Sequence, residues 1–159
     1  MTPKEEEYIH CVECCESLNQ SWRIFQDLQG AKQNPVICDA AFRYALVAYA
    51  KPYTRSDGIH KRKKNAYRLA VPPLSSKEIE LHHQILKLRD QVLAHSDLSL
   101  KEAIVSLSKF DGRTHAAILQ NIPEQLPRID AVISLIEHTL DLLYAERDRL
   151  LASLPTQTR

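Results

Sequence analysis

The sequence is poor in glycine and has no long run of apolar residues. It has three glycines in 159 residues, whereas P-loop and dinucleotide-binding sites need several around a phosphate, so we exclude both classes. Apolar runs such as Ala45–Ala48 fall far short of the roughly 20 residues that cross a bilayer. Lys4–Glu7 stands where a secretion signal needs an apolar stretch. We therefore expect a cytoplasmic protein without a membrane partner.

Charge is balanced over the chain but uneven along it. There are 21 basic and 20 acidic residues, and 44% of residues are hydrophobic, which is enough for one core and predicts a single domain over residues 1–159. Between Lys51 and Arg68, seven basic residues accompany one acidic residue. Gly58 and Pro72-Pro73 are typical of irregular backbone, so we predict a basic loop over residues 51–74.

Apolar residues spaced by three and four predict the first two helices. The first begins at a capping box, Thr2-Pro3-Lys4-Glu5, and ends at Gly30. The second runs from Asn34-Pro35 to Pro52. It carries apolar residues on nearly every side, so we expect it to be the most buried helix.

The second half of the sequence predicts two more helices and a hairpin. The third helix opens at Ser75, with Glu78 completing a second capping box, and ends near His95. Asp111-Gly112 predicts a turn between two short strands in residues 103–120. Apolar residues from Leu126 to Leu154 keep a spacing of three and four and predict the last helix, whose start Pro123 and Pro127 leave open. We predict a mainly α fold, an antiparallel bundle of about four helices with a short β-hairpin insertion between helices three and four.

The end of the third helix combines an arginine, an acid and a histidine: Arg89, Asp90 and His95. Because the 2′-hydroxyl of RNA is an internal nucleophile, a histidine that moves protons and an arginine that binds phosphate suffice for cleavage without a metal or cofactor. Arg55 and His60 have similar spacing, but they lie in the predicted loop, and we favour the pair at the helix end.

Residues 88–97, Leu-Arg-Asp-Gln-Val-Leu-Ala-His-Ser-Asp, resemble the signature of the HEPN superfamily, the higher eukaryotes and prokaryotes nucleotide-binding domains. The resemblance implies an all-helical fold, commonly a homodimer, and in many members a metal-independent ribonuclease of toxin–antitoxin, phage-defence or RNA-processing systems. The inserted hairpin is similar to that of HEPN proteins in abortive-infection loci. Other members have lost catalysis and act as binding modules.

Helix geometry also favours a dimer. Six residues place Arg89 and His95 about 120° apart in direction and about 9 Å apart along a regular helix, so one chain's pair does not converge. A two-fold dimer would bring two such pairs into one cleft. Five basic-loop residues are candidates for holding single-stranded RNA beside it: Arg55, Lys61, Arg62, Lys63 and Lys64.

We therefore predict an endoribonuclease of a toxin or phage-defence type, with Arg89, His95 and Asp90 as catalytic residues and an antitoxin as a possible protein partner. The alternative is a catalytically silent HEPN-like dimer that binds a protein or nucleotide. In that case Arg89 pairs with a neighbouring acid and His95 sits at a helix end. Asp90 either orients one of them or is a solvated acid.

The cysteine cluster near the start of the chain could be a metal site or part of the core, and we favour the core. Cys11, Cys14 and Cys15 stand beside His10, and thiolate and imidazole suit zinc. No second cysteine pair follows at a finger-like distance, and Cys11 and Cys15 fall on the apolar seam of the first helix. We predict reduced core cysteines and no metal.

Overall fold

Four α-helices, one short 3₁₀ helix and one β-hairpin form the described part of the fold. The computed structural model describes residues 1–30, 34–62, 66–90, 102–121 and 126–155. The elements in chain order are α1 (Pro3–Gln29), α2 (Pro35–Ala50), the short 3₁₀ helix η1 (Lys51–Tyr53), α3 (Ser76–Leu88), β1 (Glu102–Phe110), β2 (Arg113–Asn121) and α4 (Ile129–Ala152). This confirms the predicted mainly α fold with a hairpin between the third and fourth helices.

Local capping interactions begin three of the helices where the sequence predicts. The Thr2 hydroxyl accepts the Glu5 N–H and the Glu5 carboxylate accepts the Thr2 N–H, and Ser75 makes the same reciprocal pair at the start of α3. Asn34 accepts the Val36 N–H at 2.9 Å at the start of α2. These bonds satisfy N–H groups that a helix leaves unpaired at its start.

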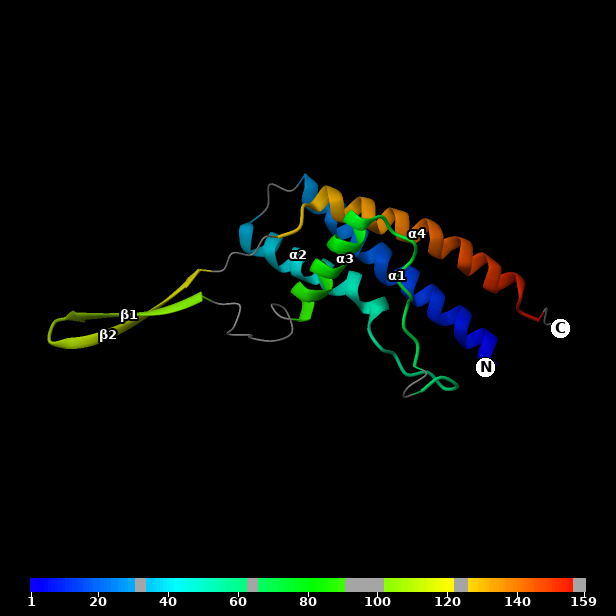
Figure 1. Cartoon of the computed structure of the whole chain (residues 1–159), viewed down its shortest axis with the longest axis horizontal. Helices are drawn as coiled ribbons and strands as arrows, with labels where there is room; N and C mark the ends of the chain where they lie inside the picture. The colour runs from blue at the N-terminus through cyan, green and yellow to red at the C-terminus, as the bar shows by residue number, and fades with distance from the viewer. Residues whose placement is uncertain (31–33, 63–65, 91–101, 122–125, 156–159) are drawn as a thin grey trace.

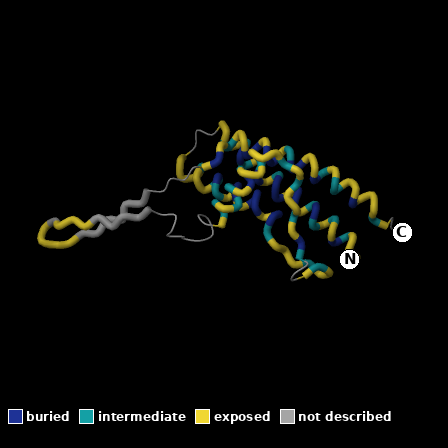
Figure 2. Tube along the Cα trace, in the orientation of Figure 1, coloured by how far each residue is buried: buried dark blue, intermediate teal, exposed yellow. Residues whose placement is uncertain are grey.

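The core lies where α1 and α4 run antiparallel along each other, which leaves both termini at one end of the molecule (Figure 1). Leu18 and Phe25 of α1 and Ile136 of α4 are fully buried. Figure 2 shows the buried residues along the inward faces of the helices. Each such side chain stabilises the fold by about 1.5–3 kcal/mol relative to exposure. None of the described helices is both long and apolar enough to cross a membrane.

Helix α2 is exposed along its first half and buried along part of its second half. Both α1 and α3 contact it, and Leu46 and Tyr49 are buried in the core. Val36 and Ile37, in contrast, are 75% and 57% exposed. Tyr44 and Val47 of the second half are also exposed, so apolar residues on nearly every side do not make α2 buried on nearly every side.

The hairpin is a two-stranded antiparallel sheet, with Phe110 paired to Arg113 at its turn. The turn residues Asp111 and Gly112 have φ angles of 52° and 70°, the left-handed pair that a type I′ turn requires. In Figure 1 the hairpin extends away from the helices. A two-stranded hairpin alone is of marginal stability in water.

Candidate functional site

The candidate catalytic arginine stands where α3 ends. At Arg89 and Asp90 the backbone widens from α to π geometry, a change that often marks functional positions in helices. The Arg89 N–H donates to the carbonyls of Ile85 and Leu86, which holds the residue on the last turn. His95 lies outside the described residues, so its predicted pairing with Arg89 stays a prediction, as does the end of the helix near it.

The Arg89 side chain is half-buried and held by its neighbour. Its Nε lies 2.9 Å from Oδ1 of Asp90, and the arginine side chain is 26% exposed. The N–H of this buried Nε makes no hydrogen bond with any described residue, so the contact with Asp90 is an ion pair without a hydrogen bond. A guanidinium carries further N–H donors beside Nε, in a planar fork that suits the oxygens of a phosphate.

A buried carboxylate anchors the basic loop to α1. Glu6, which is 6% exposed, accepts hydrogen bonds from the backbone N–H groups of Ile59 and His60 and from the hydroxyl of Tyr67. Burial acts to raise the pKa of Glu6, but these hydrogen bonds outweigh it and lower that pKa below its ordinary value. Backbone bonds between Ser56 and Tyr67 close the loop on itself.

Sequence reasoning missed Glu6. It belongs to a run of glutamates in the first turn of α1, and such acids are typical of helix starts, where they favour the dipole. The signal in the sequence was the opposite charge of the basic loop. That signal does not say which glutamate turns inward.

The described basic residues predicted to bind RNA all have partners. Nζ of Lys61 lies 3.6 Å from Oε1 of Glu7 and 4.7 Å from the centre of the Tyr67 ring. Nε of Arg62 donates to the Gly58 carbonyl at 2.9 Å. Arg55 pairs with Asp57 at 3.4 Å, and its side chain is 57% exposed. Lys63 and Lys64 lie outside the described residues.

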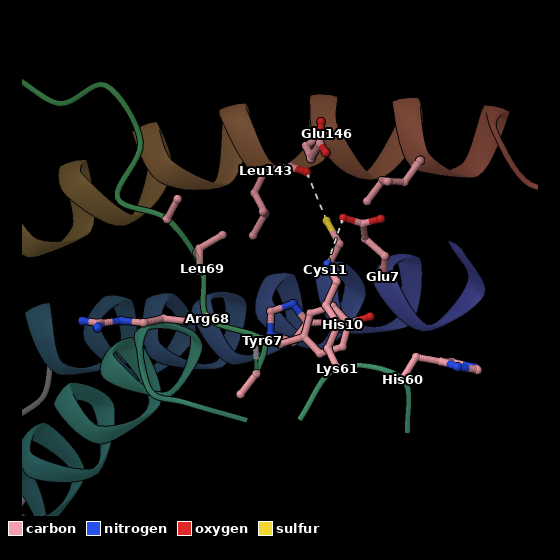
Figure 3. Close-up of a pocket in the computed structure, with 13 residues that line it drawn as sticks. Glu7, His10, Cys11, His60, Lys61, Tyr67, Arg68, Leu69, Leu143 and Glu146 are labelled. Atoms are coloured by element: carbon pink, nitrogen blue, oxygen red, sulfur yellow. Dashed lines mark hydrogen bonds and ion pairs between the residues drawn. The ribbon is translucent and has the colours of Figure 1, made fainter. Parts of the chain in front are cut away.

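Two clefts flank a stacked pair of rings, His10 on α1 and Tyr67 on the basic loop. The ring centres lie 4.6 Å apart. The first, which we call the inner cleft, has a volume of about 670 Å³ between the basic loop, α1 and α4 (Figure 3), and Lys61 and Arg68 line it. The second, the outer cleft, has about 690 Å³.

The outer cleft brings together two of the predicted RNA-binding residues. Arg55 and Arg62 both line it, together with Lys51 and the His10–Tyr67 stack. Burial, followed by the charge of Lys61, lowers the pKa of His10, so the imidazole is neutral near pH 7. Burial and the Glu6 carboxylate raise the pKa of Tyr67 to about 12. The aromatic wall is therefore uncharged. The charges of the cleft come from its three basic residues and from three acids that also line it, Glu6, Glu13 and Asp57.

The structure does not bring the basic loop to the end of α3 within one chain. In Figure 1 the basic loop lies beside the first turns of α1. Neither of the two clefts that it lines includes Arg89 or Asp90. The sequence predicts that the loop flanks the catalytic cleft. Within a single copy of the described chain these two groups of residues form separate sites.

The cysteines of α1 are core residues, as predicted. Cys11, Cys14 and Cys15 are free and no more than 5% exposed, and Cys11 donates to the Leu143 carbonyl at 3.8 Å. Burial raises the pKa of Cys11 to about 11 and that of Cys14 to about 12, which keeps both thiols protonated. Among the described residues, no three histidines, cysteines or acids are grouped so that they could hold a metal ion.

Comparisons of the chain with protein-family models, with curated proteins and with solved structures found no match. We therefore argue the function from the residues of this chain.

Proposed function

We propose that the protein is a metal-independent endoribonuclease of a toxin or phage-defence type, which cuts single-stranded RNA at a site built by two copies of the chain. One observation carries the proposal: a half-buried guanidinium, that of Arg89, stands at the widened end of α3 and is held there by the Asp90 carboxylate at 2.9 Å. The resemblance of residues 88–97 to the HEPN signature supports the same site.

Each proposed catalytic residue has a role set by its chemistry. Arg89 binds the scissile phosphate and stabilises the charge that develops on it. One His95 removes the proton of the 2′-hydroxyl, and the other protonates the 5′-oxygen that leaves. The products are a 2′,3′-cyclic phosphate and a 5′-hydroxyl. Asp90, 2.9 Å from Arg89, holds the guanidinium in place.

The outer cleft is the proposed contact for the RNA backbone. Arg55 and Arg62 line it together, and the exposed ion pair of Arg55 with Asp57 is weak enough for phosphate to displace. Lys61 contributes less, because Glu7 and Tyr67 already hold it. Because this cleft lies apart from the end of α3 in one chain, RNA that contacts both must extend along the surface.

RNA cleavage in excess EDTA tests the catalytic residues. A mixed RNA pool is incubated with the wild type, Arg89→Ala and His95→Ala, prepared identically, with Arg128→Ala and His83→Ala as controls. The control residues are exposed. We expect the first two substitutions to reduce the rate by about 100-fold or more and the controls to leave it unchanged.

The other outcomes of this assay are informative. Equal cleavage by the wild type and His95→Ala would place the activity elsewhere or reveal contamination. If several RNA classes stay intact with a confirmed dimer, the proposal fails. The catalytically silent module that binds a protein or nucleotide then takes its place.

RNA binding tests the outer cleft separately. Fluorescence anisotropy with a labelled single-stranded RNA is measured for His95→Ala and for His95→Ala carrying Arg55→Glu and Arg62→Glu, across a range of salt concentrations. Loss of two phosphate contacts should weaken binding and reduce the salt slope by about 2. The same change at Arg147 and Arg149 of α4 is the matched control. An unchanged slope would remove the outer cleft from the proposal.

A further inference from the structure

Helix α2 carries a second apolar face that no described part of the chain covers. Its members are exposed: Val36 (75%), Ile37 (57%), Ala40, Tyr44 (52%) and Val47 (40%). At 3.6 residues per turn, their directions span about 100°. That is the width of the stripe with which a helix faces a core.

The rest of α2 is already in use. Its other faces contact α1 and α3, and the Tyr44 hydroxyl accepts a hydrogen bond from Gln20 of α1 at 3.0 Å, which holds the ring at the edge of the stripe. The stripe runs from residue 36 to residue 47, about 16 Å along the helix. Large contiguous apolar patches on a protein surface mark interaction sites.

The charges beside the stripe match a second copy of the same helix. Asp39 and Arg43 lie along one edge, paired at 2.9 Å within the helix. If two α2 helices meet antiparallel about a two-fold axis near residue 41, Asp39 faces the partner's Arg43, and Val36 faces the partner's Val47. The midpoint between Ile37 and Tyr44 lies within about one residue of this axis, so Ile37 faces the partner's Tyr44. One surface that is complementary to itself is the property of a two-fold dimer.

We propose that the exposed face of α2, residues 36–47, is the surface through which two copies of this chain associate as an antiparallel helix pair. The inference deepens the proposed function, on which its biological role rests, by naming where the two copies meet. The two-fold axis of this helix pair also relates the two copies of Arg89, one at the end of each α3. Five side chains form a small interface core, and small interfaces are typical of weak association, so we expect the dimer to dissociate on dilution.

Sedimentation equilibrium of the full chain over a range of concentrations tests this surface. The wild type should pass from monomer to dimer, and Val36→Glu should raise the dissociation constant at least about tenfold by placing a charge in the stripe. Leu151→Glu in α4 is the matched control, because Leu151 is 52% exposed and lies outside the stripe. Circular dichroism checks that both variants are folded. A monomeric wild type, or Leu151→Glu and Val36→Glu with equal effects, would overturn the proposal.

A mixing experiment separates contacts between chains from the ion pair within each chain. Asp39→Arg alone and Arg43→Asp alone each place like charges along the edge, so each variant should remain monomeric where the wild type is dimeric. A mixture of the two variants should form a heterodimer, because opposite charges then face each other across the axis although neither chain regains its internal pair. Absence of the heterodimer would refute the antiparallel register.

The two proposals fail in different ways. A dimer that is weakened by Val36→Glu but cleaves no RNA would support the proposed dimer surface and refute the proposed ribonuclease activity. If a wild type that is monomeric at all concentrations cleaves RNA, the ribonuclease activity is supported. The dimer surface and the requirement for two copies are then refuted.

Discussion

The buried histidine of α3 should make the fold sensitive to acid. His82 is 1% exposed, its Nδ1 lies 2.8 Å from the Tyr49 hydroxyl, and the Tyr53 ring stands edge-on at 4.5 Å between ring centres. Burial, followed by the charges of His83 and Arg68, lowers the pKa of His82 to about 4. The folded chain therefore keeps this imidazole neutral at pH values where an unfolded chain protonates it.

The size and sign of the effect follow from the two pKa values. The unfolded pKa is 6.5 and the folded pKa about 4, and each unit corresponds to about 1.4 kcal/mol, so His82 shifts the unfolding free energy by about 3 kcal/mol in total. Above pH 6.5 the residue is neutral in both states and costs nothing. As the pH falls from 6.5 to 4, the unfolded state gains a proton that the folded state does not bind, and stability is lost. Below pH 4 the loss from this residue is complete.

Urea unfolding between pH 7.5 and 4 measures this loss. His82→Gln should remove about 3 kcal/mol of the pH dependence. His83→Gln, on the exposed neighbour, should reduce it by much less, because burial and not the charge of His83 is the larger cause of the low pKa of His82. Ser75 and His138 hold the pKa of Glu78 at about 2, so its contribution is lost between pH 4.5 and 2 and is common to all three proteins. If His82→Gln shows the wild-type pH dependence, the imidazole is not a source of acid sensitivity and the reasoning is wrong.

Three substitutions test how the fold holds the sites. Gly58→Ala should destabilise the chain by about 1–3 kcal/mol in urea unfolding, because the added methyl group meets the Glu6 carboxylate and lies 2.8 Å from Tyr67; an unchanged midpoint would show that the loop is not anchored there. Leu18→Ala should cost about 2–5 kcal/mol in thermal unfolding, because the side chain is fully buried, and a loss below 1 kcal/mol would contradict that burial. Ser75→Ala should cost about 1 kcal/mol by removing the cap of α3, and an alanine variant as stable as the wild type would mean that the capping box contributes nothing.

The helices, the starts of the first three and the hairpin followed from the sequence alone, because these features depend on residues close together in the chain. A capping box spans four residues, as at Thr2 and Ser75. The positive φ angles of Asp111 and Gly112 are set by the turn itself. Arg89 and Asp90 are sequence neighbours, so their ion pair was one of the alternatives that the sequence left open.

The tertiary structure decided which charges and apolar groups meet across long stretches of chain. Glu6 becomes the anchor of the basic loop through contacts with residues more than 50 positions away. Its neighbour on α1, Glu7, holds Lys61 of the loop. Apolar periodicity shows which residues of α2 favour burial, but the number of neighbouring elements decides how many of its faces are covered. Since α1 and α3 cover two of them, the exposed stripe from Val36 to Val47 exists only in the folded arrangement.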